Sequence, residues 1–265
     1  MESIRLEEAP RQMVGPVHRK LSGFFDISND TAEDLIGLCT EKRSFGPREP
    51  MVRDGDDFSG IYLMESGWAI RSRTLADGSR QIVNVGLPGD FLGVSALLFP
   101  RSNYDVWAKT PVETYHIEPD RLREVFRRDP DLAAAVLWVT AHEEAVLAER
   151  VVSLGRRGAR MRAAHVLCEI IARIEVVEPI NPERVMVPIS QEEFADILGV
   201  SVVHANKTLR ALDREGLIAF RNGILAVKDR PALERCAGFD NGYLHYGRVD
   251  PENRRRRTDD VARAG

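Results

Sequence analysis

The chain has 265 residues, 43% of them hydrophobic and 29% charged, which leaves room for about two globular domains of ~100–150 residues each. Its formal net charge of −4 excludes a protein that is basic over its whole surface, although a local basic face is enough to meet nucleic-acid phosphates. The longest apolar run, residues 132–139, is far below the ~20 residues of a membrane span, and the charged N-terminus does not resemble a signal peptide, so we expect a cytoplasmic protein without membrane contact.

The first part of the chain changes character near residue 21. Residues 1–20 are polar and interrupted by proline, which predicts a flexible N-terminal arm. Between residues 21 and 130, short strand-like runs alternate with glycines, and residues 68–73 show the period-two pattern of a half-buried strand. Asp77-Gly78 between two such runs is typical of a hairpin turn. The segment therefore predicts an antiparallel β-barrel or jelly roll that serves as a sensor domain.

Residues 131–156 predict a long helix followed by a hinge. Pro130 suits the first turn of a helix, and two adjacent apolar stripes run along the residues that follow. One stripe can pack on the barrel while the other pairs with a partner helix, although both stripes can also pack within one subunit. We expect a homodimer whose interface contains Val139, Val146, Leu147, Val151 and Leu154. The glycines in Gly155-Arg156-Arg157-Gly158 predict the hinge.

A helix-turn-helix is predicted within residues 157–230. Ser190 and Glu193 have the spacing of a capping box, which marks the start of a short helix, and Gly199 supplies the turn after it. Ser201 can cap a second helix with an apolar stripe at positions 205, 209 and 212. An ordinary helical hairpin is the alternative for these residues alone.

The residues after the second helix favour the DNA-binding interpretation. Residues 217–220 and 224–227 are apolar runs on either side of Arg221-Asn222-Gly223, and Asn-Gly is the strongest short hairpin signal. A two-stranded wing directly after the second helix makes a winged helix-turn-helix. Beyond it, residues 231–265 predict a short helix and a disordered tail containing the arginine run 254–257. The whole pattern predicts an α+β chain with sensor barrel, dimerisation helix and winged helix-turn-helix.

The outer face of the second helix carries side chains suited to double-stranded DNA. Asn206 can bond adenine, Lys207 can donate to guanine, and a valine can pack against a thymine methyl group. His204 suits a base or a phosphate, while Arg210 and Arg160 suit phosphates. The expected DNA-binding residues are Val202, Val203, His204, Asn206, Lys207, Arg210, Ser190 and Arg160.

The metal-ligating residue types are scattered. Cys39, Cys168 and Cys236 form no CxxC pair, so we expect no disulfide framework, zinc site or iron–sulfur cluster, and neither cofactor nor metal. Oxidation of Cys168, in the first helix of the DNA-binding unit, is kept as a hypothesis for regulation. A cupin-type barrel enzyme is a remote alternative, but it would need a cluster of His and Glu ligands, which His116 alone does not provide.

The order of barrel, long helix, hinge and winged helix-turn-helix resembles the Crp/Fnr family of bacterial transcription regulators over roughly residues 21–227. The most specific stretches are the helix-turn-helix and Pro88-Gly89-Asp90-Phe91-Leu92-Gly93, which is similar to the start of the family's phosphate-binding cassette. The resemblance implies a non-enzymatic homodimer that binds a palindromic promoter site and contacts RNA polymerase, with a barrel that senses a small signal.

The cassette departs from the family's cyclic-nucleotide-binding members. Those members place a glutamate just after the cassette glycine and an Arg-Ser pair further on, whereas here Val94 and Ser95 follow Gly93 and residues 102–105 read Ser-Asn-Tyr-Asp. A buried phosphate without its arginine is costly. We therefore expect no response to cyclic AMP. Arg101 is a substitute partner, which keeps a cyclic-nucleotide-responsive regulator as the alternative.

Two helices depart from the cyclic-AMP-responsive pattern as well. Leu147 and Ala148 stand where the resemblance implies adenine-facing hydroxyls on the long helix. Val202, Val203 and Lys207 stand where those members carry an Arg-Glu pair and a later Arg facing the bases. The chemistry of the residues at these positions still permits base readout.

Overall fold

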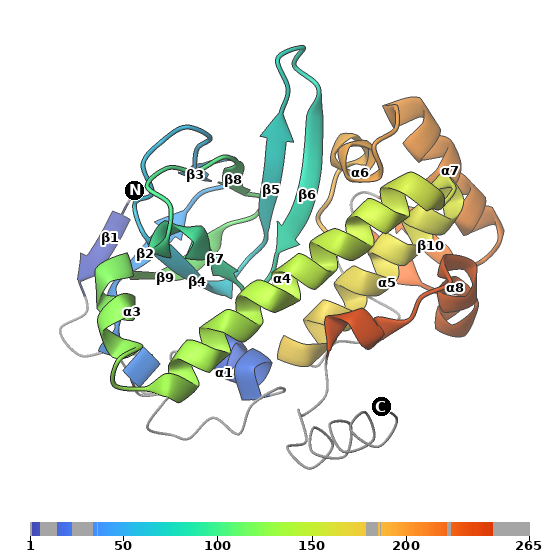
Figure 1. The fold of residues 1–265 in the computed structure, drawn as a ribbon. Coiled ribbons are helices and arrows are strands. Elements are labelled where there is room, and N and C mark those ends of the chain that lie inside the picture. The colour runs from blue at the N-terminus through green and yellow to red at the C-terminus, as the bar shows by residue number, and fades with distance from the viewer. Residues whose placement is uncertain are drawn as a thin grey trace, which may run out of the picture.

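The computed structural model describes residues 2–5, 15–22, 34–35, 37–178, 185, 187–221 and 224–245. A two-sheet β-sandwich is joined by a long helix to a helical unit that carries a small hairpin (Figure 1). This arrangement confirms the predicted α+β class and the antiparallel β-architecture of the first domain.

All strand pairs in the sandwich are antiparallel. One sheet has the order β1 (Glu2–Arg5), β2 (Cys39–Phe45), β9 (Val112–Ile117), β4 (Ile61–Ser66) and β7 (Phe91–Leu92). The other has the order β3 (Pro50–Val52), β8 (Asp105–Ala108), β5 (Ala69–Thr74) and β6 (Arg80–Gly86). A short 3₁₀ helix, η1 (Val94–Leu97), and helix α3 (Pro119–Val125) complete the sandwich.

The β5–β6 hairpin extends away from the rest of the sandwich (Figure 1). Its turn is closed by a hydrogen bond from Leu75 N to Ser79 O at 2.8 Å, and the Asp77 carboxylate accepts from Ser79 N at 2.9 Å. Gly78 has a φ of 83°, which an L side chain rarely adopts. The predicted hairpin turn at Asp77-Gly78 is therefore confirmed.

The N-terminal residues differ from the expected flexible arm. β1 pairs with β2 at the edge of the first sheet. Helix α1 (Gly15–Ser22) buries Val17 and Leu21 in the apolar cluster that also contains residues of the sandwich. The expectation was wrong for these two segments because polar residues dominate their composition, whereas two apolar residues four apart are enough to dock one helical turn.

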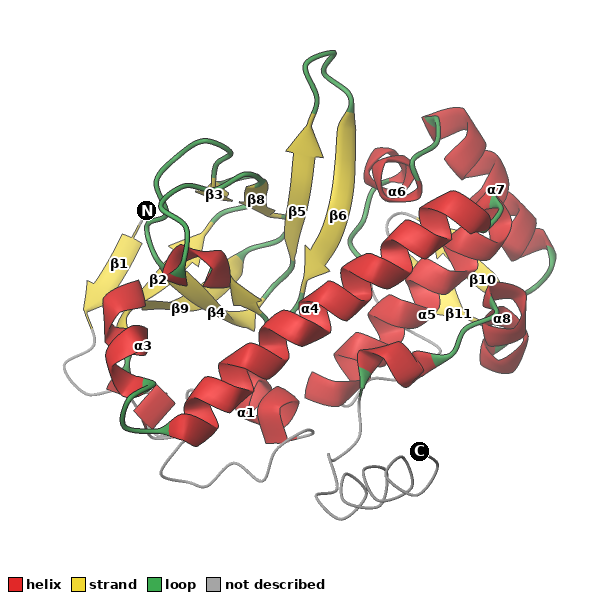
Figure 2. Ribbon diagram, in the orientation of Figure 1, coloured by secondary structure: helices red, strands yellow, loops and turns green. Residues whose placement is uncertain are grey.

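Helix α4 (Pro130–Arg156) is 27 residues long and crosses from the sandwich to the helical unit (Figure 2). The Asp129 carboxylate caps its first turn by accepting from Asp131 N and Leu132 N, both at 3.0 Å.

The two apolar stripes of α4 face different surroundings, and this corrects two predicted interface residues. Val139 is 2% exposed in the cluster shared with the sandwich, and Val146 is 1% exposed against Ala172 and Leu244. Both side chains are thus buried within the chain and are not available to a partner. Val151 is 69% exposed. Hydrophobicity alone does not distinguish an inner stripe from an outer one, which is why the sequence assigned both to the interface.

The helical unit begins after a two-residue break. α5 (Ala159–Val177) follows Arg157 and Gly158, and the remaining elements are α6 (Gln191–Leu198), α7 (Val202–Arg214), β10 (Ile218–Arg221), β11 (Ile224–Val227) and α8 (Arg230–Ala237). One apolar core contains Ile82 and Leu87 of the sandwich together with Leu167 of α5 and Leu209 of α7. The sandwich and the helical unit are therefore packed against each other without a solvent gap at this point.

The chain after α8 packs back on the two long helices. A 3₁₀ helix, η3 (Asn241–Leu244), places Leu244 O 3.0 Å from His142 Nδ1 of α4, and Tyr243 Oη donates to Glu169 Oε2 of α5 at 2.9 Å. Residues 246–265, including the arginine run 254–257 and the predicted disordered tail, lie outside the described residues. None of the helices that the structure describes is long and apolar enough to span a bilayer.

Candidate nucleic-acid interface

The first helix of the interface, α6, has the capping box that its sequence predicts. Ser190 Oγ accepts from Glu193 N at 3.2 Å, and Ser190 N donates to Glu193 Oε2 at 2.6 Å. At the other end Gly199 has a φ of 63° and a Cβ there would stand 3.2 Å from Leu154 Cδ2. Glycine thus fits both the left-handed turn and the close approach of α4.

The second helix, α7, buries one face and exposes the other. Ser201 Oγ accepts from His204 N at 3.3 Å and so caps the helix. Ala205, Leu209 and Leu212 are buried at 0%, 3% and 0% exposure, as the apolar stripe predicts. The buried stripe fixes the rotation of α7 about its axis, so the opposite side chains face solvent together.

Six predicted DNA-binding residues share this exposed side of α7. Val202, Val203, His204, Lys207 and Arg210 are exposed and Asn206 is half-buried. The two valines, Val202 and Val203, are 39% and 79% exposed and so are open to contact. Among the described residues neither Lys207 nor Arg210 has an ion-pair partner, so both cations are available to phosphates.

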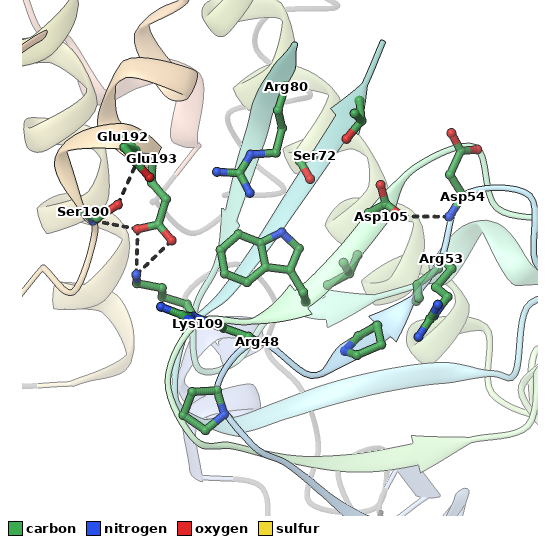
Figure 3. Close-up of a pocket in the computed structure, with 16 residues that line it drawn as sticks. Arg48, Arg53, Asp54, Ser72, Arg80, Asp105, Lys109, Ser190, Glu192 and Glu193 are labelled. Carbon is green, nitrogen blue, oxygen red and sulfur yellow. Dashed lines mark hydrogen bonds and ion pairs between the residues drawn. The ribbon is translucent and has the colours of Figure 1, made fainter. Parts of the chain in front are cut away.

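The other two predicted DNA-binding residues are already engaged elsewhere in the protein. Arg160 donates from Nε to both carboxylate oxygens of Glu215, at 3.0 and 3.1 Å, and Glu215 is the acidic residue that closes α7. This ion pair raises the pKa of Arg160, and its expected contact with a DNA phosphate stays a prediction. Ser190 lies at the rim of a cleft between α6 and the sandwich, where its hydroxyl serves the capping box (Figure 3).

Two ion pairs hold α6 against the sandwich. Across the cleft, Lys109 Nζ lies 2.7 Å from Glu193 Oε2 (Figure 3). In the second pair, Arg80 Nη2 lies 2.7 Å from Asp196 Oδ2. The Arg80 guanidinium also covers the ring of Trp107 at 5.4 Å. The two residues of each ion pair are 84 and 116 positions apart in the sequence, respectively, so no local sequence pattern could have predicted these pairs. They fix the first helix of the interface relative to the sensor domain.

A second cavity of about 600 Å³ lies between the sandwich and α4. Its apolar walls include Leu92, Val94, Leu97, Phe126, Val136 and Leu147. On its polar side Arg71 Nη1 lies 3.4 Å from Glu143 Oε2, the Arg71 guanidinium covers the Tyr104 ring at 4.1 Å, and Tyr104 Oη bonds Ser95 Oγ at 3.0 Å. The cavity thus offers apolar contact area to a ligand, and the charge of Arg71 in its wall is already paired with Glu143.

Arg101, the possible substitute partner for a phosphate, does not line this cavity. Its Nε donates to Asp57 Oδ1 at 3.1 Å, and its side chain is 71% exposed. The cavity wall does not include it. The alternative of a cyclic-nucleotide site built on Arg101 therefore loses its geometric basis.

The cysteines and histidines form no cluster in the described part of the chain. Burial raises the pKa of both Cys39 and Cys168 to about 12, so each thiol stays protonated and unreactive at neutral pH. No group of three or more His, Cys, Asp or Glu side chains among the described residues could hold a metal ion. The hypothesis of redox regulation through Cys168 is weakened by this burial.

Two family models match the chain, a cyclic nucleotide-binding domain over residues 42–129 and a Crp-like helix-turn-helix domain over residues 161–236. Together they cover more than half of it. The transcriptional activator protein FnrL of Cereibacter sphaeroides is 29% identical over 216 residues, which are 79% of this chain and 86% of FnrL. The nitrogen fixation regulation protein FixK of Bradyrhizobium diazoefficiens is 28% identical over 193 residues, 73% of this chain and 80% of FixK.

The same fold occurs in the solved structure of FixK2 from Bradyrhizobium japonicum, with a TM-score of 0.68 and 22% identity over 75% of this chain and 98% of that one. These relatives are transcription regulators and not enzymes, so the cupin-type enzyme alternative is set aside.

Proposed function

Since this chain belongs to the Crp/Fnr family of DNA-binding transcription regulators, we propose that it acts as a homodimer that places two copies of α7 in the major groove of a palindromic promoter site. The observation that carries the proposal is the exposed side of α7, where two unpaired cations lie beside an amide and two valines. Phosphate contacts would come from Arg210, and base contacts from Asn206, Lys207 and the valines.

The proposed dimer forms along the outer stripe of α4. Positions 137, 140, 144, 147, 151 and 154 alternate in steps of three and four, which is the seam of a two-stranded coiled coil. Within this stripe Leu137 and Val151 are each 69% exposed, and Leu147 and Leu154 are half-buried. A two-fold axis through the seam would set the two reading helices about one DNA turn, ~34 Å, apart. Residues Leu147, Val151 and Leu154 keep their proposed interface role, and Leu137 joins them.

The sensor domain is proposed not to respond to cyclic AMP. A phosphate entering the cavity of the sandwich would meet apolar walls and two arginines, of which Arg71 is paired with Glu143 and Arg123 donates to Leu97 O. An iron–sulfur cluster held by four cysteine thiolates is also unsuited to this chain, because the chain has three cysteines. The cavity instead suits a small, mostly apolar and uncharged ligand.

Selection of DNA from a random-sequence pool tests the proposed function. We expect the bound pool to converge on an inverted repeat with half-site centres 10–10.5 base pairs apart or a multiple of that spacing. A pool that converges on a single half-site, or that shows no sequence preference at moderate salt, would contradict the dimeric reading mode. Transcription from a template carrying the selected site, with and without the protein, tests contact with RNA polymerase.

A further inference from the structure

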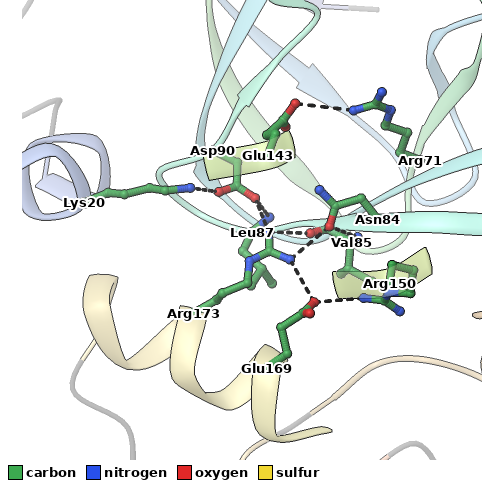
Figure 4. A network of polar contacts seen from close by, with 10 residues as sticks. All are labelled: Lys20, Arg71, Asn84, Val85, Leu87, Asp90, Glu143, Arg150, Glu169 and Arg173. Carbon is green, nitrogen blue, oxygen red and sulfur yellow. Dashed lines mark hydrogen bonds and ion pairs between the residues drawn. The ribbon is translucent and has the colours of Figure 1, made fainter. Parts of the chain in front are cut away.

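A buried network of charged side chains joins the sensor domain to the DNA-binding unit (Figure 4). Asp90 lies in the loop before β7, and its Oδ2 accepts from Arg173 Nη2 of α5 at 2.8 Å. Lys20 of α1 bonds the other oxygen of Asp90. On the next turn of α5, Glu169 accepts from Arg150 of α4 at 2.8 Å. We call these five residues the junction network; each of their side chains is at most 8% exposed.

The centre of the junction network makes several further hydrogen bonds. Arg173 also donates to Asn84 Oδ1 at 3.0 Å and to Val85 O at 2.8 Å, both in β6. Asp90 Oδ2 accepts in addition from Leu87 N at 2.9 Å. Burial opposes the ionisation of Asp90, but the charges of Lys20 and Arg173 outweigh it and hold the pKa of this carboxyl below its usual value. The group is therefore charged at neutral pH.

Such a network tolerates little displacement. A buried ion that loses a partner is left uncompensated, so a movement that separates these side chains is costly. Arg173 contacts three groups of the sandwich through one planar guanidinium, so it fixes direction as well as distance. Because α5 and α7 share one apolar core, the position of α5 on the sandwich also sets the position of α7.

The junction network also reaches the cavity of the sandwich. Asp90 precedes Leu92 and Gly93 by two and three residues, and both of these line the cavity. The loop between Leu87 and Gly93 is tight, since Asp90 N donates to Leu87 O at 3.0 Å and Gly89 has a φ of 85°. A movement of this loop at the cavity would therefore displace Asp90.

We propose that Asp90 and Arg173 are positioning residues: their buried pair fixes the angle between the sandwich and the DNA-binding unit and thereby sets the half-site spacing that the dimer accepts. This inference rests on the proposed dimeric function. Lys20 supports the pair from α1 and lies outside both segments matched by the family models.

The test uses a variant that removes the charges without leaving one unpaired. In Lys20→Met/Asp90→Asn/Arg173→Met the Asn carbonyl can still accept from Leu87 N, and apolar replacement of buried ions is often neutral for stability. The matched control is Glu124→Gln/Arg128→Met, which removes an exposed ion pair within the sandwich domain. Arg173→Lys, which keeps the charge but loses the planar contacts, serves if the triple variant does not fold.

Two readouts are compared at a temperature where all variants are folded. The first is binding to the selected operator and to versions with one base pair added or removed between the half-sites. We expect the preference for the original spacing to fall by about 2- to 30-fold in the triple variant, the range of typical coupling effects, and to stay unchanged in the control. A purely stabilising role would lower the melting temperature without changing this preference.

The second readout is tryptic cleavage after Arg156 and Arg157 in the absence of DNA. We expect faster cleavage in the triple variant, since release of α5 exposes the break between α4 and α5. Unchanged spacing preference and unchanged cleavage in a folded triple variant would overturn the inference. If the wild type selects no inverted repeat, the proposed function fails, while the cleavage comparison still decides whether the junction network holds the two parts together.

Discussion

Three neighbouring side chains of α7 have different chemistry and should be separable by mutation. Asn206 and Lys207 have the donors and acceptors that read base edges, and Arg210 lies one turn further on. We expect Asn206→Ala or Lys207→Ala to cost about 1–3 kcal/mol on the best site and to relax the preference at one base pair per half-site. Binding to a panel of single-base operator variants measures both effects.

Arg210→Ala is the matched comparison. A lost phosphate contact weakens binding to all sequences alike and lowers the slope of log K against log salt by about one unit per half-site contact. Unchanged affinity and preference in both Asn206→Ala and Lys207→Ala would mean that α7 is not the reading helix.

Cys168 illustrates how burial overrides a reactive residue type. The thiol is 5% exposed in the core of the helical unit, and burial raises its pKa to about 12. We therefore expect Cys168 to react with a thiol-specific reagent only at the rate at which the protein unfolds. Comparison of wild type and Cys168→Ser isolates this cysteine in the labelling time course. Fast labelling of Cys168 in native protein, or a peroxide response lost in Cys168→Ser, would restore the redox hypothesis.

At the scale of elements, the sequence predicted where helices and turns begin and end, but it did not predict which face of α4 is buried within the chain. Ser190 with Glu193, Gly199 and the Asp77-Gly78 turn act over a few residues, so the sequence located these helix and hairpin boundaries. The burial of Val146 instead depends on Leu244, about a hundred residues away. The ion pair of Arg160 with Glu215 and the ion pairs between α6 and the sandwich also join residues that are distant in the sequence, so the sequence did not reveal them.

The outer stripe of α4 leads to a revised test of the dimer. We expect Leu137→Glu/Val151→Glu to give a folded monomer, because both side chains are 69% exposed on the outer stripe, and to abolish operator binding. Sedimentation at micromolar concentration gives the oligomeric state, and thermal unfolding shows that the fold is kept.

Val146→Glu is the control for the same helix. Its side chain is 1% exposed, so an unpaired buried carboxylate should destabilise the protein by at least about 3 kcal/mol instead of producing a stable monomer. A wild type that sediments as a monomer even with DNA present would exclude the proposed seam.

At the scale of the whole molecule, the sandwich and the DNA-binding unit are less separate than the sequence implied. The glycines around residues 155–158 predict a hinge, and the helices do break there. Beyond that break, however, one apolar core, the cleft ion pairs and the junction network all cross from one part to the other. Such contacts join residues distant in the sequence, so neither hydrophobic periodicity nor sequence motifs can predict how strongly they hold the two parts together.

The sensor cavity provides the last prediction. Arg71 and Arg123 line it, but Arg71 faces Glu143 and Arg123 donates to Leu97 O at 3.0 Å. A cyclic phosphate would have to displace one of these partners or remain uncompensated among apolar walls, and either costs binding free energy. We expect calorimetry to detect no cyclic AMP or cyclic GMP binding with a Kd of about 1 μM or tighter, the affinity that corresponds to about −8 kcal/mol. Glu143→Gln releases Arg71 and should bind either nucleotide more tightly than the wild type does, whereas equal binding by both proteins would show that Glu143 is not the obstacle. Micromolar or tighter binding of either nucleotide by the wild type would reinstate the cyclic-nucleotide-responsive regulator.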